Sequence, residues 1–287
     1  MRNKTVNVLL FLTMIFASSY SSEKDLSLLK IGICTNYING LIMKPSGYSY
    51  IEESVGRFLM PKKDEAEFKN MLEDLTDFPL PVKACNGFIP KDLKSVGPES
   101  SQVDILEYME TTFRRAEKVG VEIIVFGSGG SRSIPEGFSR EEALKQFVTL
   151  CMNMAPIAEK YNVVVVLEPL NIKECNFINS VAEGGEIVKK VNHPNFQLLA
   201  DIYHMKMDDE TPENIVKYGQ FIKHIHIAEK EDRAVPGTYN EDFSSYFSAL
   251  KEINYQGMIS IEARWEDMEK QAPLGIKIIK QQLKQIK

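Results

Sequence analysis

Val163–Glu168, with the sequence VVVVLE, is the stretch that points most clearly to the fold. A run of branched apolar residues of this kind is typical of a strand covered on both faces, as in a parallel sheet. Seven further runs of similar character occur along the chain, and the sequence therefore predicts eight strands. In chain order the others are Leu29–Cys34, Tyr48–Glu52, Val82–Asn86, Val121–Phe126, Phe196–Asp201, Phe221–Ile227 and Met258–Glu262.

Segments with helical periodicity separate these runs. Ser139 with Glu142, and Ser180 with Glu183, have the spacing of a capping box at a helix start. The expected helices are Lys62–Leu75, Val103–Lys118, Ser139 to Tyr161, one beginning at Ser180, one at Thr211, Asp242–Ile253 and Gly275–Gln285.

Strands and helices that alternate over about 250 residues indicate an α/β fold, a (β/α)8 TIM barrel. We expect a single domain over residues 29–287. A doubly wound open sheet is the alternative, but such a sheet more often carries a glycine fingerprint after its first strand. The chain has Thr35–Ile38 (TNYI) at that point.

The composition is that of a globular protein, with 44% hydrophobic and 26% charged residues among 287. The charge is acidic, since 34 Lys and Arg against 40 Asp and Glu give a net charge of −6. A nucleic-acid-binding domain normally presents a basic face, so this balance argues against a nucleic-acid partner. A local basic patch on a protein of acidic net charge would still be compatible with nucleic-acid binding.

The first 21 residues have the layout of a secretory signal peptide. Arg2 and Lys4 precede an apolar run, Val6–Phe16, and small residues follow at Ala17–Ser19. The run is too short to span ~30 Å of hydrocarbon as a helix, so no stable membrane insertion is expected after cleavage. We therefore expect an exported protein, periplasmic or secreted. The alternative is an uncleaved hydrophobic tail on a cytoplasmic protein.

Metal-binding side chains end the last four predicted strands. Glu168, Asp201 and Glu262 end three of them, and His226 lies near the end of the fourth, at intervals of 33, 25 and 36 residues. Each interval is one strand-plus-helix unit, so the side chains should converge at the mouth of the barrel. Three acids that converge without a cation would repel one another, which predicts one divalent metal ion. Oxygen-rich ligation with one imidazole suits Mn²⁺ first, with Mg²⁺, Co²⁺ or Zn²⁺ as alternatives.

Other residues near the predicted mouth are candidates for substrate contact. His224 faces the same way as His226 but lies deeper, where it would support the site or belong to the core. The glycine-rich loop Gly127–Arg132 (GSGGSR) could offer Arg132 and backbone N–H groups to an anionic or polyhydroxylated substrate, or it could be a flexible turn. Asn86 is expected in the pocket wall, where Phe58 and Phe88 would either join it or pack inside their loops.

Four motifs together resemble the xylose isomerase-like TIM barrels, the sugar phosphate isomerase/epimerase superfamily. They are LEPLN (167–171), ADIYHM (200–205), HIHIAE (224–229) and SIEAR (260–264). The ketose 3-epimerases are the nearest characterised group, and the resemblance is strong from Val121 onward. It implies Glu168, Asp201, His226 and Glu262 as metal ligands, and Glu174, His204 and Arg233 as substrate-binding residues.

The resemblance implies a sugar isomerase or epimerase that removes a proton next to a carbonyl through an enediolate. Glu168 and Glu262 would be the two bases, and a carbohydrate the small-molecule partner. A lyase or hydrolase of 3-keto-glycosides with the same base and metal is the main alternative. A non-catalytic sugar-binding barrel is a third hypothesis. An endonuclease IV-like protein would need more histidines, and none precedes His193. Homo-oligomerisation is left open.

Overall fold

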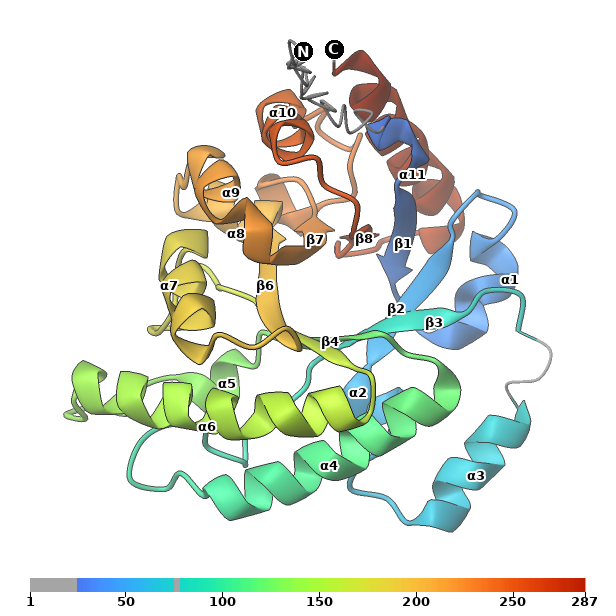
Figure 1. Cartoon of the computed structure of the whole chain (residues 1–287). Coiled ribbons are helices and arrows are strands. Elements are labelled where there is room, and N and C mark those ends of the chain that lie inside the picture. The colour runs from blue at the N-terminus through green and yellow to red at the C-terminus, as the bar shows by residue number, and fades with distance from the viewer. Residues whose placement is uncertain (1–24, 75–77, 287) are drawn as a thin grey trace, which may run out of the picture.

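The predicted barrel is confirmed. The computed structural model describes residues 25–74 and 78–286, so the predicted signal peptide lies outside the described residues. Eight parallel strands close into a barrel in sequence order, β1 beside β2 and so on around to β8 (Figure 1). The strands are β1 Lys30–Cys34, β2 Tyr50–Ser54, β3 Val82–Asn86, β4 Ile123–Phe126, β5 Val164–Leu167, β6 Phe196–Asp201, β7 Ile222–Ile227 and β8 Met258–Ile261.

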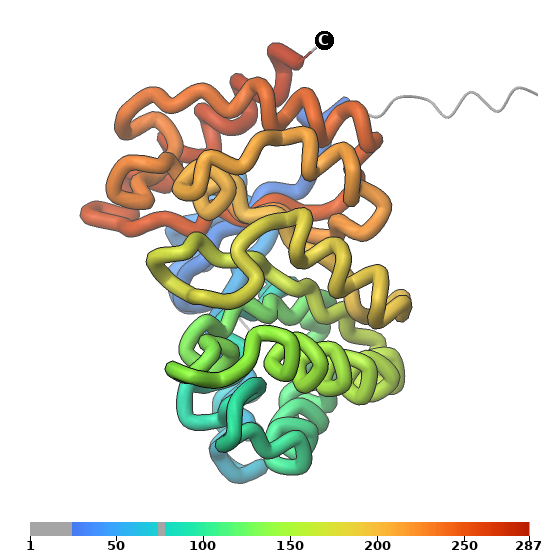
Figure 2. The backbone as a smooth tube through the Cα atoms, turned by 90° about the vertical axis from the view of Figure 1, so that its left-hand side faces the viewer, coloured from blue at the N-terminus to red at the C-terminus, as the bar shows by residue number. Residues whose placement is uncertain are grey.

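Helices form the outer layer around the barrel (Figures 1 and 2). Figure 2 shows α11, in red, returning beside the short 3₁₀ helix at Leu26–Leu28, with which it is in contact. The α-helices are α1 Gly40–Met43, α2 Val55–Phe58, α3 Glu65–Asp74, α4 Gln102–Val119, α5 Gly129–Arg132, α6 Arg140–Lys160, α7 Val181–Val191, α8 Ile202–Met207, α9 Glu213–Tyr218, α10 Ser244–Glu252 and α11 Met268–Gln285. Within residues 25–74 and 78–286, none of the helices is long and apolar enough to cross a membrane.

The two serine N-caps are found where the sequence predicts them, but the predicted start of the last helix was wrong. Ser139 and Ser180 cap α6 and α7 by accepting the N–H groups of Glu142 and Glu183. The last helix begins at Met268 rather than Gly275, with Asp267 as its cap. Pro273 lies in the second turn, where its missing N–H removes only one intrahelical hydrogen bond, and the helix continues through it.

The barrel interior is apolar in its lower part. Tyr50, Val166, Leu199 and Met258 are among the side chains that fill it. Gly32 makes room for the Tyr50 ring, because an added Cβ would lie only 2.2 Å from it. This filled layer closes the barrel beneath the carboxyl ends of the strands, where the four predicted ligands lie.

Strand register brings the ends of the last strands to one level. Asp201 pairs with His226 across β6 and β7, and His226 pairs with Ser260 across β7 and β8. Glu168 and Glu262 each follow directly after the last residue of their strand. The parallel register therefore places all four predicted ligands at the same rim.

Candidate metal centre

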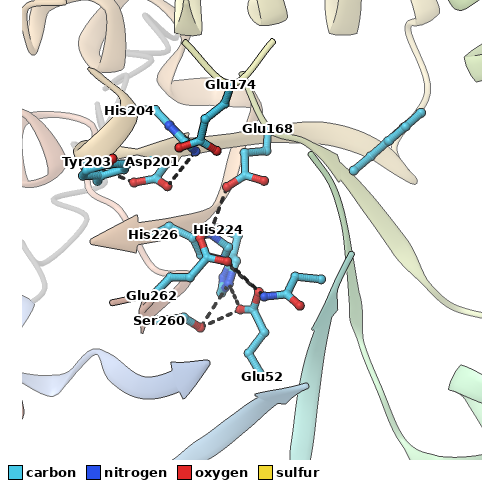
Figure 3. Close-up of polar contacts among 12 residues, drawn as sticks. Glu52, Glu168, Glu174, Asp201, Tyr203, His204, His224, His226, Ser260 and Glu262 are labelled. Atoms are coloured by element: carbon cyan, nitrogen blue, oxygen red, sulfur yellow. Dashed lines mark hydrogen bonds and ion pairs between the residues drawn. The ribbon is translucent and has the colours of Figure 1, made fainter. Parts of the chain in front are cut away.

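The four predicted ligands meet at the mouth of the barrel (Figure 3). Glu168, Asp201, His226 and Glu262 each offer one ligand atom, and these atoms all lie within 4.8 Å of one another. His226 Nδ1 lies 3.0 Å from Glu168 Oε1 and 3.1 Å from Glu262 Oε2. Ligands bound at right angles to an ion at about 2.1 Å are themselves about 3 Å apart. Three carboxylates and one imidazole at this spacing fit a divalent cation.

Local structure fixes the first two carboxylates. Asp201 is the N-cap of α8, and its Oδ1 accepts the N–H of Tyr203 at 2.8 Å, so Oδ2 is directed to the site. Glu168 lies against Gly127, where an added Cβ would be 2.1 Å from Glu168 Oε2. A side chain at position 127 and the observed position of Glu168 are therefore incompatible.

The site attracts positive charge strongly. Burial raises the pKa of Glu168. Burial also disfavours ionisation of Glu262, but His226 and Arg233 outweigh it and hold the pKa of Glu262 at about 2. For His226, burial favours the neutral ring, yet Glu52 and Glu262 raise its pKa well above the usual value. An environment that favours a charged imidazole also favours a metal cation.

Glu52 is a buried carboxylate that the sequence analysis did not single out. It lies in the middle of β2, rather than at a strand end, and contacts the Nε2 atoms of both His224 and His226 at 2.8 Å (Figure 3). His224 thus pairs with Glu52 and packs edge-on against the His226 ring, with the ring centroids 5.1 Å apart. Burial opposes the charge on Glu52, but the two histidines outweigh it and hold its pKa below the usual range. The available signal was the adjacent acidic pair Glu52 and Glu53 at the end of a predicted strand.

His204 and Glu174, two of the residues implied by the resemblance, lie beside the ligands. His204 Nε2 is 3.5 Å from Asp201 Oδ2. Asn171, which the sequence analysis did not single out, donates from Nδ2 to Glu174 Oε1 at 3.1 Å and to His204 Nδ1 at 2.8 Å. The backbone N–H of Asn171 also points to His204 Nδ1. Two donors on Nδ1 make it the acceptor and leave the ring proton on Nε2, facing Asp201.

Arg233, the third such residue, lies across the ligand set. Its guanidinium contacts Glu262, lies 3.5 Å from Asp201 Oδ2 and stacks 4.6 Å above the Tyr203 ring. Its backbone has φ 52°, in the left-handed region that non-glycine residues rarely adopt. The buried Glu229 organises this loop by accepting the N–H groups of Gly237, Tyr239 and Glu241.

A pocket of about 280 Å³ opens above the ligands. Asn86 lines it and donates to Glu262 Oε1 at 3.1 Å. Phe58 and Phe88 do not line it, because both are fully buried in the hydrophobic core, as in the loop-packing alternative. The lining residues are Asn86, Gly87, Gly127, Ser128, Gly129, Glu168, Leu170, Glu174, His204, Arg233 and Glu262.

The structure places Arg132 away from this pocket. Ser128, with φ 41°, begins the short helix α5, and the Arg132 side chain is completely buried behind the end of β5. Its guanidinium donates to the carbonyl oxygens of Phe126, Glu168 and Ile178. Because those bonds occupy it, Arg132 supports the backbone of Glu168 and is not free to bind a substrate. The glycines of the same loop do line the pocket.

Comparisons with known proteins agree on the family. The family model of xylose isomerase-like TIM barrels matches residues 42–282. L-ribulose 3-epimerase of Methylomonas sp. is 34% identical over 130 residues, 45% of each chain. A putative hydroxypyruvate isomerase of Mus musculus is 31% identical over 140 residues, 46% of this chain and 50% of the relative. These matches span about half the length of the curated relatives.

A solved structure extends the likeness of fold to nearly the whole chain. D-psicose 3-epimerase, crystallised in the presence of D-fructose, superposes with a TM-score of 0.76 and 20% identity, over 89% of this chain and all of that one. The family model covers most of the barrel, and the motifs at its strand ends are those from which the sequence predicted the family. The chain belongs to the xylose isomerase-like TIM barrel family.

Proposed function

We propose that the protein is a divalent-metal-dependent isomerase or epimerase of an unphosphorylated sugar. The observation that carries this proposal is the position of two carboxylates, Glu168 and Glu262, which lie 3.0 and 3.1 Å from His226 Nδ1 and come from different strands. The names of the curated relatives, an L-ribulose 3-epimerase among them, support the reaction class.

The chemistry is the transfer of a proton next to a carbonyl. A bound divalent cation would polarise the carbonyl and stabilise the negative charge of the enediolate. Glu168 follows β5 and Glu262 follows β8, so in this proposal the two carboxylates would approach a substrate carbon from different sides. One removes the carbon-bound proton and the other returns a proton, which inverts a centre or shifts the carbonyl.

The charges around the pocket favour a neutral substrate. Among the lining residues, three are glutamates and Arg233 is the single residue with a permanent positive charge. Arg233 is already paired with Glu262 and Asp201. A phosphate or carboxylate is normally held by unpaired cationic donors, and this pocket offers hydroxyl groups better partners than it offers anions. Its volume of about 280 Å³ is at the small end for ligand pockets, which suits a single sugar unit.

Export of the chain would point to the same substrate class. The signal peptide proposed for residues 1–21 would take the protein to a compartment where unphosphorylated sugars or glycosides are met, since sugar phosphates are cytoplasmic. This argument is independent of the pocket charges.

The test is hydrogen exchange in D₂O with the Mn²⁺-loaded protein. The panel is neutral ketoses, the same ketoses as phosphates, hydroxypyruvate and 3-keto-glycosides. Deuterium uptake by a neutral sugar without fragmentation is the expected result. Release of an aglycone would favour the lyase, and a preference for phosphates or hydroxypyruvate would overturn the neutral substrate class. Binding of sugars without any exchange would favour a non-catalytic barrel.

A further inference from the structure

We propose that Glu52 is a positioning residue of the metal centre, which holds the His226 ring so that Nδ1 is presented to the metal. Both side chains are completely buried, and Glu52 Oε1 lies 2.8 Å from His226 Nε2. The inference rests on the proposed function in one respect, namely that the four ligands bind a divalent cation. It concerns a residue outside that ligand set.

The chemistry of the two groups decides which ring nitrogen carries the proton. A carboxylate can only accept a hydrogen bond, so the nitrogen that faces Glu52 must donate. His226 therefore keeps its proton on Nε2 whether or not a cation is bound. Nδ1 lies between Glu168 and Glu262, and it is the nitrogen that would give up its proton and offer a lone pair to a bound cation. A carboxylate that accepts the second N–H of a ligating histidine both orients the ring and makes it a more basic ligand.

Glu52 is itself fixed by donors from two other strands. Its Oε2 accepts the hydroxyl of Ser260 on β8 at 2.7 Å and lies 2.8 Å from His224 Nε2 on β7. The Ser260 hydroxyl is also 2.8 Å from the hydroxyl of Tyr50. Among the described residues, His224 Nδ1 has no hydrogen-bond partner, which leaves Nε2 as the protonated nitrogen that donates to Glu52. With both oxygens engaged, the carboxylate has one orientation (Figure 3).

The next residue in the chain provides a matched control. Glu53 is as buried as Glu52 but points to the opposite face of β2, as alternate residues of a strand do. Its carboxylate accepts the backbone N–H groups of Tyr37 at 2.8 Å and Ser54 at 2.7 Å, and it pairs with Arg57. Glu53→Gln thus removes a buried, hydrogen-bonded charge from the same strand without touching a metal ligand.

The experiment compares Mn²⁺ affinity, measured by titration calorimetry, and the melting temperature of the metal-free protein. Glu52→Gln is expected to weaken Mn²⁺ binding about 10–100-fold, the usual effect of losing such a partner of a ligating histidine. Glu53→Gln is expected to lower the melting temperature while it leaves the affinity within about threefold of the wild type. A purely structural role for Glu52 would lower the melting temperature and leave the affinity unchanged.

The outcomes separate this inference from the proposed function. If Glu52→Gln protein binds Mn²⁺ as tightly as the wild type, the proposed role of Glu52 is overturned and the proposed function stands. Wild-type protein that binds no divalent cation overturns both. If Glu52→Gln does not fold, Glu52→Asp, which keeps the charge but withdraws it from His226, is compared with Glu53→Asp. Wild-type affinity in Glu52→Asp would then refute the inference.

Discussion

Gly127→Ala should disable the site while the protein remains folded. The added Cβ would lie 2.1 Å from Glu168 Oε2, whereas carbon and oxygen atoms in close contact are at least about 3.3 Å apart. The Glu168 carboxylate must therefore move by about 1 Å. The carboxyl carbon of Glu168 is already 3.3 Å away and Leu170 Cδ2 is 3.6 Å away, so the clash falls on this one oxygen.

A displacement of this size is large enough to slow catalysis strongly. Misplacing a reacting group by about 1 Å can cost about 10²-fold in rate. We expect kcat/KM to fall about 100-fold and Mn²⁺ binding to weaken, because the proposed mechanism uses Glu168 both as ligand and as base. The assay is the initial rate of deuterium uptake at saturating Mn²⁺, with metal content measured on the same samples.

The matched control is Gly56→Ala. Gly56 is exposed, and an added Cβ there meets its nearest neighbour, Ser54 Oγ, at 3.8 Å, an ordinary contact. Gly56→Ala protein should match the wild type in the rate of deuterium uptake and in metal content. If metal-loaded Gly127→Ala turned over within threefold of the wild type, Glu168 would not need its observed position, and the assignment of Glu168 as ligand and base would be refuted.

Three further predictions follow from the structure, and a fourth follows from the N-terminal sequence. Asp201→Asn should lower the bound metal measured by elemental analysis, and full occupancy would contradict its assignment as a ligand. Glu168→Gln and Glu262→Gln should each lower turnover by about 10²–10⁴-fold in samples that retain metal, and near wild-type rates in both would exclude the two-base mechanism. Arg132→Met should lower the free energy of unfolding by about 2–4 kcal/mol in denaturant titrations, because three buried carbonyl groups lose a charged donor. A raised KM with unchanged stability would instead indicate substrate binding by Arg132. Protein recovered from a periplasmic or secreted fraction should lack the residues before about Ser22 by mass spectrometry, and an intact Met1 there would contradict the proposed export.

The meeting of the four candidate ligands could be predicted from sequence because their placement is repeated from one strand-plus-helix unit to the next. Glu168, Asp201, His226 and Glu262 each lie at or near the end of a strand, one strand-plus-helix unit apart. In a parallel barrel all such ends point to one rim, so no knowledge of packing was needed to bring the four together. The same reasoning does not locate a residue whose partner lies at a different position within its own strand-plus-helix unit.

Arg132 shows how local backbone geometry overrides a sequence pattern. A glycine-rich loop at the rim suggested an arginine open to the substrate, but the left-handed backbone at Ser128 begins α5 and directs Arg132 inward. Three carbonyl oxygens accept from the buried guanidinium and offset part of the cost of removing its charge from water. Nothing in the order of residues 127–132 identifies those carbonyl groups as its partners.

Periodicity along the chain was sufficient to establish the strands, their parallel order and the rim at which the metal ligands meet, because these depend on short-range hydrophobic pattern. The contacts of Glu52 are of another kind. Its partners, His224 and His226, are 172 and 174 residues away in sequence. They become neighbours only when the barrel closes between β1 and β8, which brings inward-facing side chains of β2 and β7 within hydrogen-bonding distance. Which nitrogen of His226 is left to face the candidate metal site is therefore a consequence of closure, since it depends on a carboxylate that reaches the ring across the inside of the barrel.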